Sequence, residues 1–336
     1  MTYLISGGTG LVGSFLIENI IQRESFDKRD YLFTYRSLES QKKLEEKGLK
    51  TIKADLTDPA SLKKAIVDVE AVINVASIAD DWAKWNDLYT VNVLGVKNLI
   101  EACFSSNSDA FLIHTSSTGV HGHYIPEIPI DESFPFNPTS IYQKSKYLQE
   151  KEIWDFSKEN GWKNFSILRP PSVIGPRDTK TLLPIFNAVW QNKFPVLKGG
   201  NGYSTFIHPF DLSQALLLVA ENPEKTRGQA YNLKSFECLL KEFLTLIVNT
   251  INPPTPPKEI NYHLVYFLAV LSEVYAKVTG RPTTLNRYRV TKFSRSRRYI
   301  DKKIKDHIGF NPKKDLKTTI TESYEWFIEN NQFPPS

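Results

Sequence analysis

A glycine-rich loop near the start of the chain most constrains what it can fold into. The apolar run at residues 3–6 is followed at once by glycines at positions 7, 10 and 13, in the pattern GxxGxxG, and a helix is expected from residue 11. Glycine lets the backbone turn tightly and approach a phosphate closely, and the free N–H groups at a helix N-terminus attract an anion. Between a strand and a helix, this spacing is the fingerprint of a dinucleotide-binding loop. The loop residues expected to bind such a cofactor are Gly7, Thr9, Gly10, Leu11, Val12 and Gly13.

The first 115 residues alternate short apolar runs with amphipathic stretches. Strands are expected at residues 3–6, 31–35, 50–53, 71–75 and 110–114, and helices at 11–22, 40–47, 59–67 and 90–103. An isolated glycine loop would also fit an ordinary turn, but this alternation builds a parallel sheet with helices on both faces. The predicted fold class is therefore α/β, a doubly wound parallel Rossmann sheet with a smaller, irregular C-terminal substrate domain.

The second half of the chain has a looser pattern. A helix is expected from residue 142 to residue 159, then a strand at 164–168 and the turn Arg169-Pro170-Pro171. Shorter helical patterns follow at 182–192 and 211–221. We assign residues 1–170 and about 206–235 to the dinucleotide-binding domain, and about 171–205 and 236–336 to the substrate-binding region.

Composition narrows the class of protein. With 336 residues, 41% hydrophobic and 24% charged, the chain is globular rather than disordered. Residues 281–305 hold ten Lys or Arg against one acid, Asp301, a local charge of +9 within a total of +5. Apolar residues interleave with these charges, so we expect a folded element and no nucleic-acid partner. The two cysteines, Cys103 and Cys238, exclude a disulfide scaffold, and the short apolar start leaves no room for a secretion signal. A cytoplasmic location is expected.

The most hydrophobic stretch is residues 262–278. It contains Glu273 and Lys277 and is shorter than a bilayer span, so a packed helix is expected. The alternative is an interfacial helix that touches a membrane, for which the basic segment that follows would suit anionic lipid.

The end of the second expected strand bears on the choice of nicotinamide cofactor. The sequence there is Tyr35-Arg36-Ser37, without the acid that would receive ribose hydroxyls, and a guanidinium can bind a 2′-phosphate. We therefore favour NADP(H) over NAD(H), the competing interpretation of Arg36 being a solvated surface residue. Asp55 is placed to accept a hydrogen bond from the adenine amino group, and residues 74–77 end the fourth strand beside the cofactor.

Three residues form a candidate catalytic set. Tyr142 and Lys146 are four positions apart and share one face of the expected helix. A neighbouring ammonium favours the phenolate, so we expect Lys146 to lower the pKa of Tyr142 and also to hold the nicotinamide ribose. Ser117 lies in a hydroxyl-rich turn after a strand and is expected to orient a substrate carbonyl. The simpler interpretation of Ser117 is a turn-forming serine, and that of Tyr142 and Lys146 is a chance spacing on a helix surface. Against these interpretations, the serine and the Tyr-x-x-x-Lys motif follow the nucleotide loop in the expected order.

The chain resembles the extended short-chain dehydrogenase/reductase family over nearly its whole length. The matching motifs are the glycine loop, Asp55-Leu56, Asn74-Val75-Ala76, Asn92, Ser116-Ser117, Tyr142, Lys146, Arg169-Pro170, Gly175-Pro176 and the segment 206–211. The resemblance implies that Tyr142 is the acid/base, that Lys146 binds ribose, that Ser117 polarises the substrate oxygen and that Asn92 belongs to the catalytic set. It further implies a homodimer, and cofactor contacts by Leu56, Val75, Ala76, Ser77, Thr115, Ser116, Pro170 and Val173.

The branch of the family is indicated by aromatic and proline-rich segments. The sequence Leu168-Arg169-Pro170-Pro171 lacks the Asn common in nucleotide-sugar epimerases, and residues 298–312 resemble the hydroxysteroid branch. The pattern is similar to 3β-hydroxysteroid dehydrogenases, sterol dehydrogenases and dihydroflavonol-reductase-like proteins. We expect an alcohol/ketone pair on a hydrophobic, sterol-like, flavonol-like or β-keto substrate. The substrate contacts expected are Ser117, Trp82, Trp85, Pro171 and Ser172, although tryptophans often serve only the core.

Two other functions stay open. A nucleotide-sugar epimerase, dehydratase or reductase could use the same scaffold, with the basic segment holding a diphosphate. A nucleotide-sensing module without chemistry would not need the Ser-Tyr-Lys set. No metal is expected, because His121 and His123 have no third ligand at a recognisable spacing.

Overall fold

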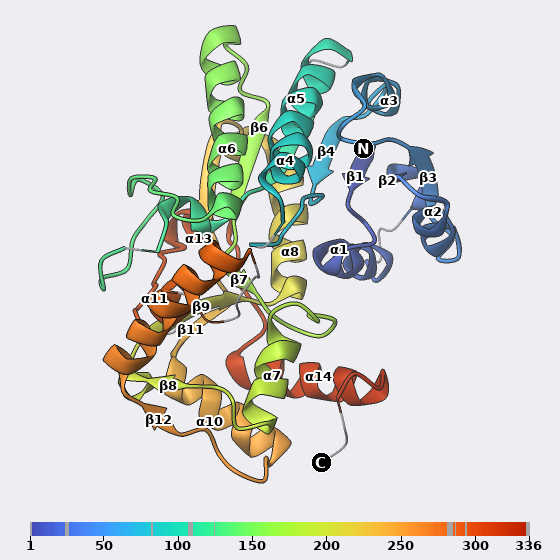
Figure 1. Ribbon diagram of the computed structural model, residues 1–336. Coiled ribbons are helices and arrows are strands. Elements are labelled where there is room, and N and C mark those ends of the chain that lie inside the picture. Colours follow the sequence, from blue (N-terminus) through green and yellow to red (C-terminus); the bar gives the residue numbers. More distant parts are fainter. Residues whose placement is uncertain are drawn as a thin grey trace.

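Seven parallel strands form the central sheet of the computed structural model, which describes residues 2–23, 27–81, 83–106, 110–123, 125–280, 285, 287–292 and 294–333 (Figure 1). Their order is β10-β6-β5-β4-β1-β2-β3. The strands are β1 (Tyr3–Ser6), β2 (Tyr31–Tyr35), β3 (Lys50–Lys53), β4 (Ala71–Asn74), β5 (Phe111–Thr115), β6 (Phe165–Arg169) and β10 (Gln229–Asn232). Every residue of β1 and β4 is buried, which explains their nearly unbroken apolar sequence. The edge strand β3 instead exposes a lysine at each end.

Helices cover both faces of this sheet. Ile5 of β1 packs in a core with Leu16 and Leu216, whereas its neighbour Leu4 packs on the other face with Leu62 and Leu99. The first face carries α1 (Leu11–Ile21), α2 (Leu38–Glu45) and α8 (Pro209–Ala220), and the second carries α3 (Pro59–Ala65), α5 (Gly95–Ser106) and α6 (Ile141–Asn160). The predicted doubly wound α/β fold is confirmed.

The expected helix at 90–103 is interrupted. After the short helix α4 (Trp85–Leu88), residues Tyr89–Leu94 form a π-helical segment, and the regular helix α5 begins only at Gly95. Gly95 lies so close to the third-strand loop that a Cβ there would be 2.8 Å from the Leu56 Cβ. The wider turn is fixed from the other side by Asn92, whose amide bonds the loop after β4.

Most of the remaining elements build a second lobe below the carboxyl edge of the sheet in Figure 1. A three-stranded sheet contains β7 (Ser172–Val173), β9 (Tyr203–Ile207) and β11 (Phe236–Leu239), and β8 (Val196–Leu197) pairs with β12 (Glu259–Ile260). The helices of this part are α7 (Leu182–Trp190), α10 (Leu240–Ile251), α11 (Tyr262–Thr279), α12 (Arg287–Lys292) and α14 (Leu316–Glu329), whereas α9 (Pro223–Thr226) and α13 (Lys302–Ile308) pack on the Rossmann part, beside α8 and β10. The core of the second lobe, around Phe186, Phe243 and Phe327, is separate from those of the Rossmann sheet.

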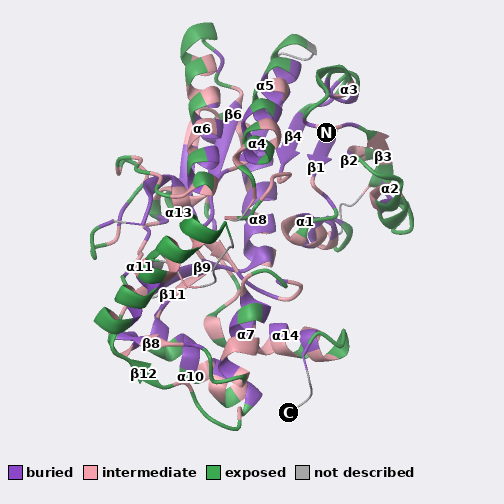
Figure 2. Cartoon of the chain, in the orientation of Figure 1, coloured by how far each residue is buried: buried purple, intermediate pink, exposed green. Residues whose placement is uncertain are grey.

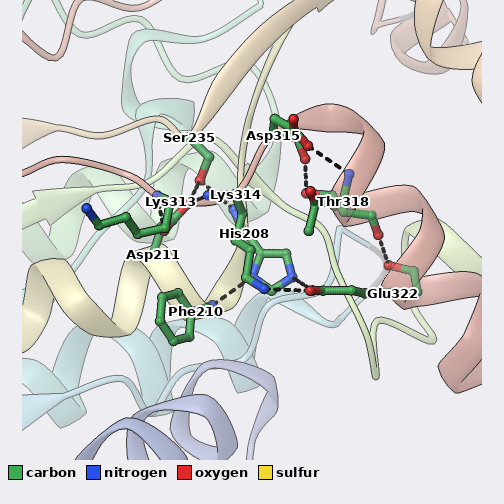
Figure 3. A network of polar contacts seen from close by, with 11 residues as sticks. His208, Phe210, Asp211, Ser235, Lys313, Lys314, Asp315, Thr318 and Glu322 are labelled. Carbon is green, nitrogen blue, oxygen red and sulfur yellow. Dashed lines mark hydrogen bonds and ion pairs between the residues drawn. The ribbon is translucent and has the colours of Figure 1, made fainter.

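A polar network joins the start of α8 to the C-terminal segment (Figure 3). His208 caps α8 by accepting from the Phe210 N–H at 3.0 Å, and its other ring nitrogen lies 3.5 Å from Glu322 of α14. Asp211 accepts from the backbone N–H groups of Lys313 and Lys314 at 2.8 and 3.2 Å. The second lobe is therefore tied to the helix that packs against α1.

Helix α11 occupies the predicted residues and packs on the protein by one side only. Among its apolar side chains only Val265 and Ala269 are buried, and the rest of the helix is largely exposed (Figure 2). Within the residues that the structure describes, no helix is both long and apolar enough to cross a membrane.

Candidate active site

The glycine loop joins β1 to α1 at the carboxyl edge of the sheet. Gly7 has a φ of 83°, and a Cβ there would lie 2.7 Å from the Ala76 nitrogen. A Cβ on Gly13 would lie 2.1 Å from the Gly7 carbonyl oxygen, so α1 can approach the loop this closely only with glycine at that position. Gly10 is the N-cap of α1 and has no side chain to cap it, which leaves the first-turn N–H groups to an anion. The loop fits the pyrophosphate of a dinucleotide.

Lys146 is a buried amine on α6. Its side chain is almost fully enclosed, and Nζ donates to the Thr115 carbonyl oxygen at the end of β5, at 3.1 Å. Burial lowers the pKa of Lys146 from 10.5 to about 7, although the nearby Glu150 carboxylate acts to raise it. The hydrogen bond holds this helix face against the edge of the sheet where the cofactor loop also lies.

Tyr142 lies one helical turn before Lys146 and is half-buried. Burial raises the pKa of Tyr142, and the Asp81 carboxylate raises it further. The expectation that Lys146 lowers the pKa of Tyr142 is therefore wrong for the chain by itself. The phenolate would lose its contact with water and would face the Asp81 carboxylate, and the Lys146 amine is directed to Thr115 instead. The protonated phenol is the form that can donate a proton to a carbonyl oxygen.

Ser117 caps the short turn that follows β5. Its Oγ accepts from the Gly119 N–H at 3.0 Å, and the residue is partly exposed. A Cβ added at Gly119 would lie 3.1 Å from this Oγ and 3.2 Å from Cγ of Gln143, the neighbour of Tyr142. The structure thus places the Ser117 turn against the first turn of α6. The hydroxyl keeps its proton for another acceptor while it caps Gly119.

The side chains of Asn92 and Ser116 are both buried and hydrogen-bonded to other groups of the protein. The Asn92 amide bonds the backbone of Ile78 in both directions, at 2.8 and 3.0 Å, and donates to Ser145 of α6 at 3.0 Å. The Ser116 hydroxyl donates to Glu150. Asn92 therefore acts as a positioning residue between the loop after β4 and the Tyr-Lys helix, and the Ser116 side chain supports the buried part of α6.

A buried ion pair lies next along the same helix and was not expected from the sequence. Glu150 follows Lys146 by four residues, and its carboxylate accepts from Arg169 Nε and Nη2 at 3.0 and 2.7 Å. Arg169 Nη1 also donates to the Glu132 carbonyl oxygen at 3.2 Å. Both charged groups are almost fully enclosed. The spacing Lys-x-x-x-Glu was the available signal, because positions four apart share a helix face.

The other expected cofactor residues line the carboxyl ends of the strands. Val75, Ala76 and Ser77 follow β4 and are half-buried, as are Leu11, Val12, Asp55 and Val173, whereas Thr9, Gly10 and Arg36 are exposed and Leu56 and Pro170 are buried. Asp55 uses one carboxylate oxygen to accept from the Thr57 N–H and hydroxyl, each at 2.9 Å. Arg36 follows the last residue of β2.

The expected substrate contacts fall in different places. Trp82 lies outside the described residues. The Trp85 ring lies 5.7 Å from the Tyr89 ring and 5.0 Å from Lys144 Nζ, so it packs α4 against the outer part of α6. Pro171 is buried, and Ser172 begins β7, the strand that leads from the Rossmann sheet into the second lobe.

His121 and His123 are buried beside the same turn. His121 packs among the rings of Phe134, Phe136 and Tyr299, and burial lowers its pKa from 6.5 to about 4. His123 meets the Gln143 amide at 2.8 Å. The described residues contain no group of three or more His, Cys, Asp or Glu side chains arranged to hold a metal ion.

The parallel sheet, the glycine loop and the Tyr-x-x-x-Lys pair on α6 define an enzyme of the extended short-chain dehydrogenase/reductase type. The chain belongs to the NAD dependent epimerase/dehydratase family, whose model matches residues 3–233.

Relatives within this family differ in the molecules that their names mention. The chain is 23% identical to the mouse (Mus musculus) sterol-4-alpha-carboxylate 3-dehydrogenase, decarboxylating, over 96% of this chain and 90% of the relative. It is also 23% identical to the N-acetyl-alpha-D-glucosaminyl-diphospho-ditrans,octacis-undecaprenol 4-epimerase of Escherichia coli O157:H7, over 86% of this chain and 84% of the relative. The fold is similar to that of dTDP-glucose 4,6-dehydratase from Bacillus anthracis solved in complex with NAD, with a TM-score of 0.75, 18% identity and coverage of 99% and 98%.

Proposed function

We propose that this enzyme interconverts a secondary alcohol and a ketone on a hydrophobic substrate with a nicotinamide cofactor, and that Tyr142 is its acid/base. The observation that carries the proposal is the helix face of α6, where Tyr142 lies one turn from Lys146 and the Lys146 amine is held against the end of β5. A half-buried phenol beside a buried amine, at the sheet edge that bears the glycine loop, suits proton transfer to a bound carbonyl.

The chemistry can be written with the chain's own residues. A bound nicotinamide supplies the hydride that adds to the carbonyl carbon, or receives it in the reverse direction. In reduction the C=O π pair moves to the oxygen, which takes the proton of the Tyr142 hydroxyl. Ser117 donates a hydrogen bond to the same oxygen as charge develops on it. Lys146 would bind the nicotinamide ribose and, as an ammonium, stabilise the phenolate that Tyr142 becomes.

Two observations support the hydrophobic substrate class and the cofactor. The mouse relative, which is named for a sterol carboxylate, aligns with 96% of this chain. Arg36 stands at the end of β2 where no acid opposes a phosphate, which supports a preference for NADP(H), while NAD is the cofactor held by the similar dehydratase structure.

The second candidate is an epimerase or dehydratase acting on a sugar diphosphate. It is favoured by the Escherichia coli relative, whose name contains a diphospho-linked sugar and which aligns with 86% of this chain. Tyr142 would then take the proton of a sugar hydroxyl while a bound nicotinamide would accept the hydride from the same carbon, and the hydride would later return to the same molecule.

A cofactor-coupled screen of sterols, β-keto acids and sugar nucleotides separates these candidates. Net oxidation or reduction of an apolar alcohol or ketone supports the proposal, and epimerisation of a sugar nucleotide without net cofactor turnover contradicts the substrate class. Tyr142→Phe should lower kcat by about 10²–10⁴-fold with cofactor affinity retained. Tyr147→Phe is the matched control on the same helix, where the Tyr147 ring packs on Phe136. Unchanged turnover in Tyr142→Phe would rule out the acid/base assignment.

A further inference from the structure

Helix α11 carries its apolar side chains on the side that faces away from the protein. Its exposed apolar residues are Leu264 (53%), Phe267 (59%), Leu268 (45%), Leu271 (49%), Val274 (56%), Tyr275 (51%) and Val278 (79%). At 3.6 residues per turn these seven positions fall within an arc of about 120° that runs the full length of the helix. A surface helix of a globular protein normally turns its apolar side toward the core and its polar side toward solvent. An exposed apolar stripe of this size marks an interaction surface.

The inner side of α11 is held firmly to the second lobe. Val265 and Ala269 pack with Leu197 and with Val290 of α12. Glu273 accepts from the backbone N–H and the guanidinium of Arg287, each at 2.7 Å. These contacts show that α11 is docked on the protein. Its apolar stripe is therefore exposed on a helix that is already in its folded position.

Charge identifies the kind of partner. The helix α12, which packs on α11, begins in a basic part of the sequence, but its Arg287 is paired with Glu273, so the free charge beside the stripe comes from lysines at the two ends of α11. Lys277 is exposed on α11 itself, and Lys198 lies with Nζ 4.5 Å from the centre of the Tyr262 ring at the other end of the helix. Two copies of this surface would bring these lysines together, whereas an anionic lipid surface neutralises them.

We propose that α11 is a membrane-surface helix that lies in the headgroup region of an anionic bilayer with its seven-residue apolar stripe inserted. A helix of 18 residues is about 27 Å long and would lie in the plane of the bilayer rather than across it. Lys198 and Lys277, at the two ends of the helix, would contact lipid phosphates at the same surface. This inference does not depend on the substrate or the cofactor proposed above.

Flotation with lipid vesicles tests the proposal on the full-length protein. The wild type should float with vesicles of equimolar phosphatidylcholine and phosphatidylglycerol, and much less with phosphatidylcholine alone or at high salt. Phe267→Gln/Leu271→Gln/Val274→Gln should lower the partition coefficient by about tenfold or more, because three inserted side chains become polar. All three side chains are exposed, so folding and cofactor binding should not change.

The matched control replaces three equally exposed apolar residues elsewhere. Leu38, Val67 and Ile128 are 80%, 57% and 69% exposed, and their replacement by Gln should leave vesicle binding as in the wild type. The proposal is overturned if the wild type does not float, if the α11 variant floats like the wild type, or if both triple variants lose binding equally. It is also overturned if the α11 variant halves the molar mass in solution, because the stripe would then bind a second copy of the chain.

Discussion

Glu150 and Arg169 form an ion pair inside the protein, with Nη2 and Oε2 separated by 2.7 Å and both side chains almost free of solvent contact. Glu150 lies one turn beyond Lys146 on α6, and Arg169 ends β6 immediately before Pro170. The pair therefore joins the helix that carries Tyr142 and Lys146 to the strand that leads into the second lobe. Ser116, at the end of β5, donates to the same carboxylate.

Removing one member of this pair should be costly. Glu150→Gln leaves the Arg169 guanidinium buried without a counter-charge, and we expect the free energy of unfolding to fall by about 3 kcal/mol. The double variant Glu150→Gln/Arg169→Gln should recover part of that loss. Urea unfolding of the two variants and the wild type measures both effects.

Lys151→Ala provides the control for this prediction. Lys151 pairs with Asp155 on the exposed side of the same helix. When Lys151 is removed, the Asp155 carboxylate stays in contact with water, so the unfolding midpoint should not change. If Glu150→Gln were as stable as Lys151→Ala, the pair would contribute little to holding α6 in place.

The sequence predicted the fold better than it predicted the environment of the site. The strands at 3–6, 31–35 and 50–53 match the structure residue for residue, because apolar runs between glycine or charged segments leave few alternatives. The raised pKa of Tyr142 and the π-helical turn at Tyr89–Leu94 could not be predicted, since they depend on contacts with Asp81 and with the backbone of Ile78, both far away in sequence. The same holds for α11, where periodicity shows an apolar stripe but not which side of the helix the protein covers.

The buried amine of Lys146 should reduce the stability of the chain. Its folded pKa of about 7 is below the ordinary value of 10.5, so between these two values the unfolded chain binds more protons, and the folded state is penalised at neutral pH. Lys146→Met should therefore raise the free energy of unfolding by up to about 4 kcal/mol at neutral pH while abolishing turnover. The gain should shrink as the pH rises toward 10.5.

Denaturant unfolding without added cofactor, at neutral and at alkaline pH, measures this difference. Lys144→Met changes an exposed lysine of the same helix and should show no such pH-dependent gain. A Lys146→Met variant that is no more stable than the wild type at neutral pH would show that the amine is not penalised by burial.

Three buried histidines should make the protein sensitive to acid. Burial lowers the pKa of His114 and His208 to about 3 and that of His121 to about 4, against 6.5 in the unfolded chain. The unfolded chain binds more protons below 6.5, so stability is lost as the pH falls from there toward 4 and 3. Three such groups give a slope of up to about 4 kcal/mol per pH unit.

His121→Phe tests one of the three. The His121 ring already lies among aromatic rings, so phenylalanine can replace it, and the slope of stability against pH should fall by about a third. His263→Phe, at an exposed position of α11, should leave the slope unchanged. Equal slopes for His121→Phe and the wild type would mean that His121 titrates normally in the folded protein.

Arg36 should decide the choice between the two nicotinamide cofactors. The residue is exposed after the last position of β2, where its guanidinium can pair with a 2′-phosphate through two hydrogen bonds, and Arg36→Ala removes them. We expect the Kd for NADPH to rise by about tenfold or more and that for NADH to change little. Arg29→Ala removes the same charge just before the opposite end of β2 and should affect neither cofactor. Titration of cofactor fluorescence measures all six dissociation constants, and a wild type that binds both cofactors equally would show that Arg36 is a solvated surface residue.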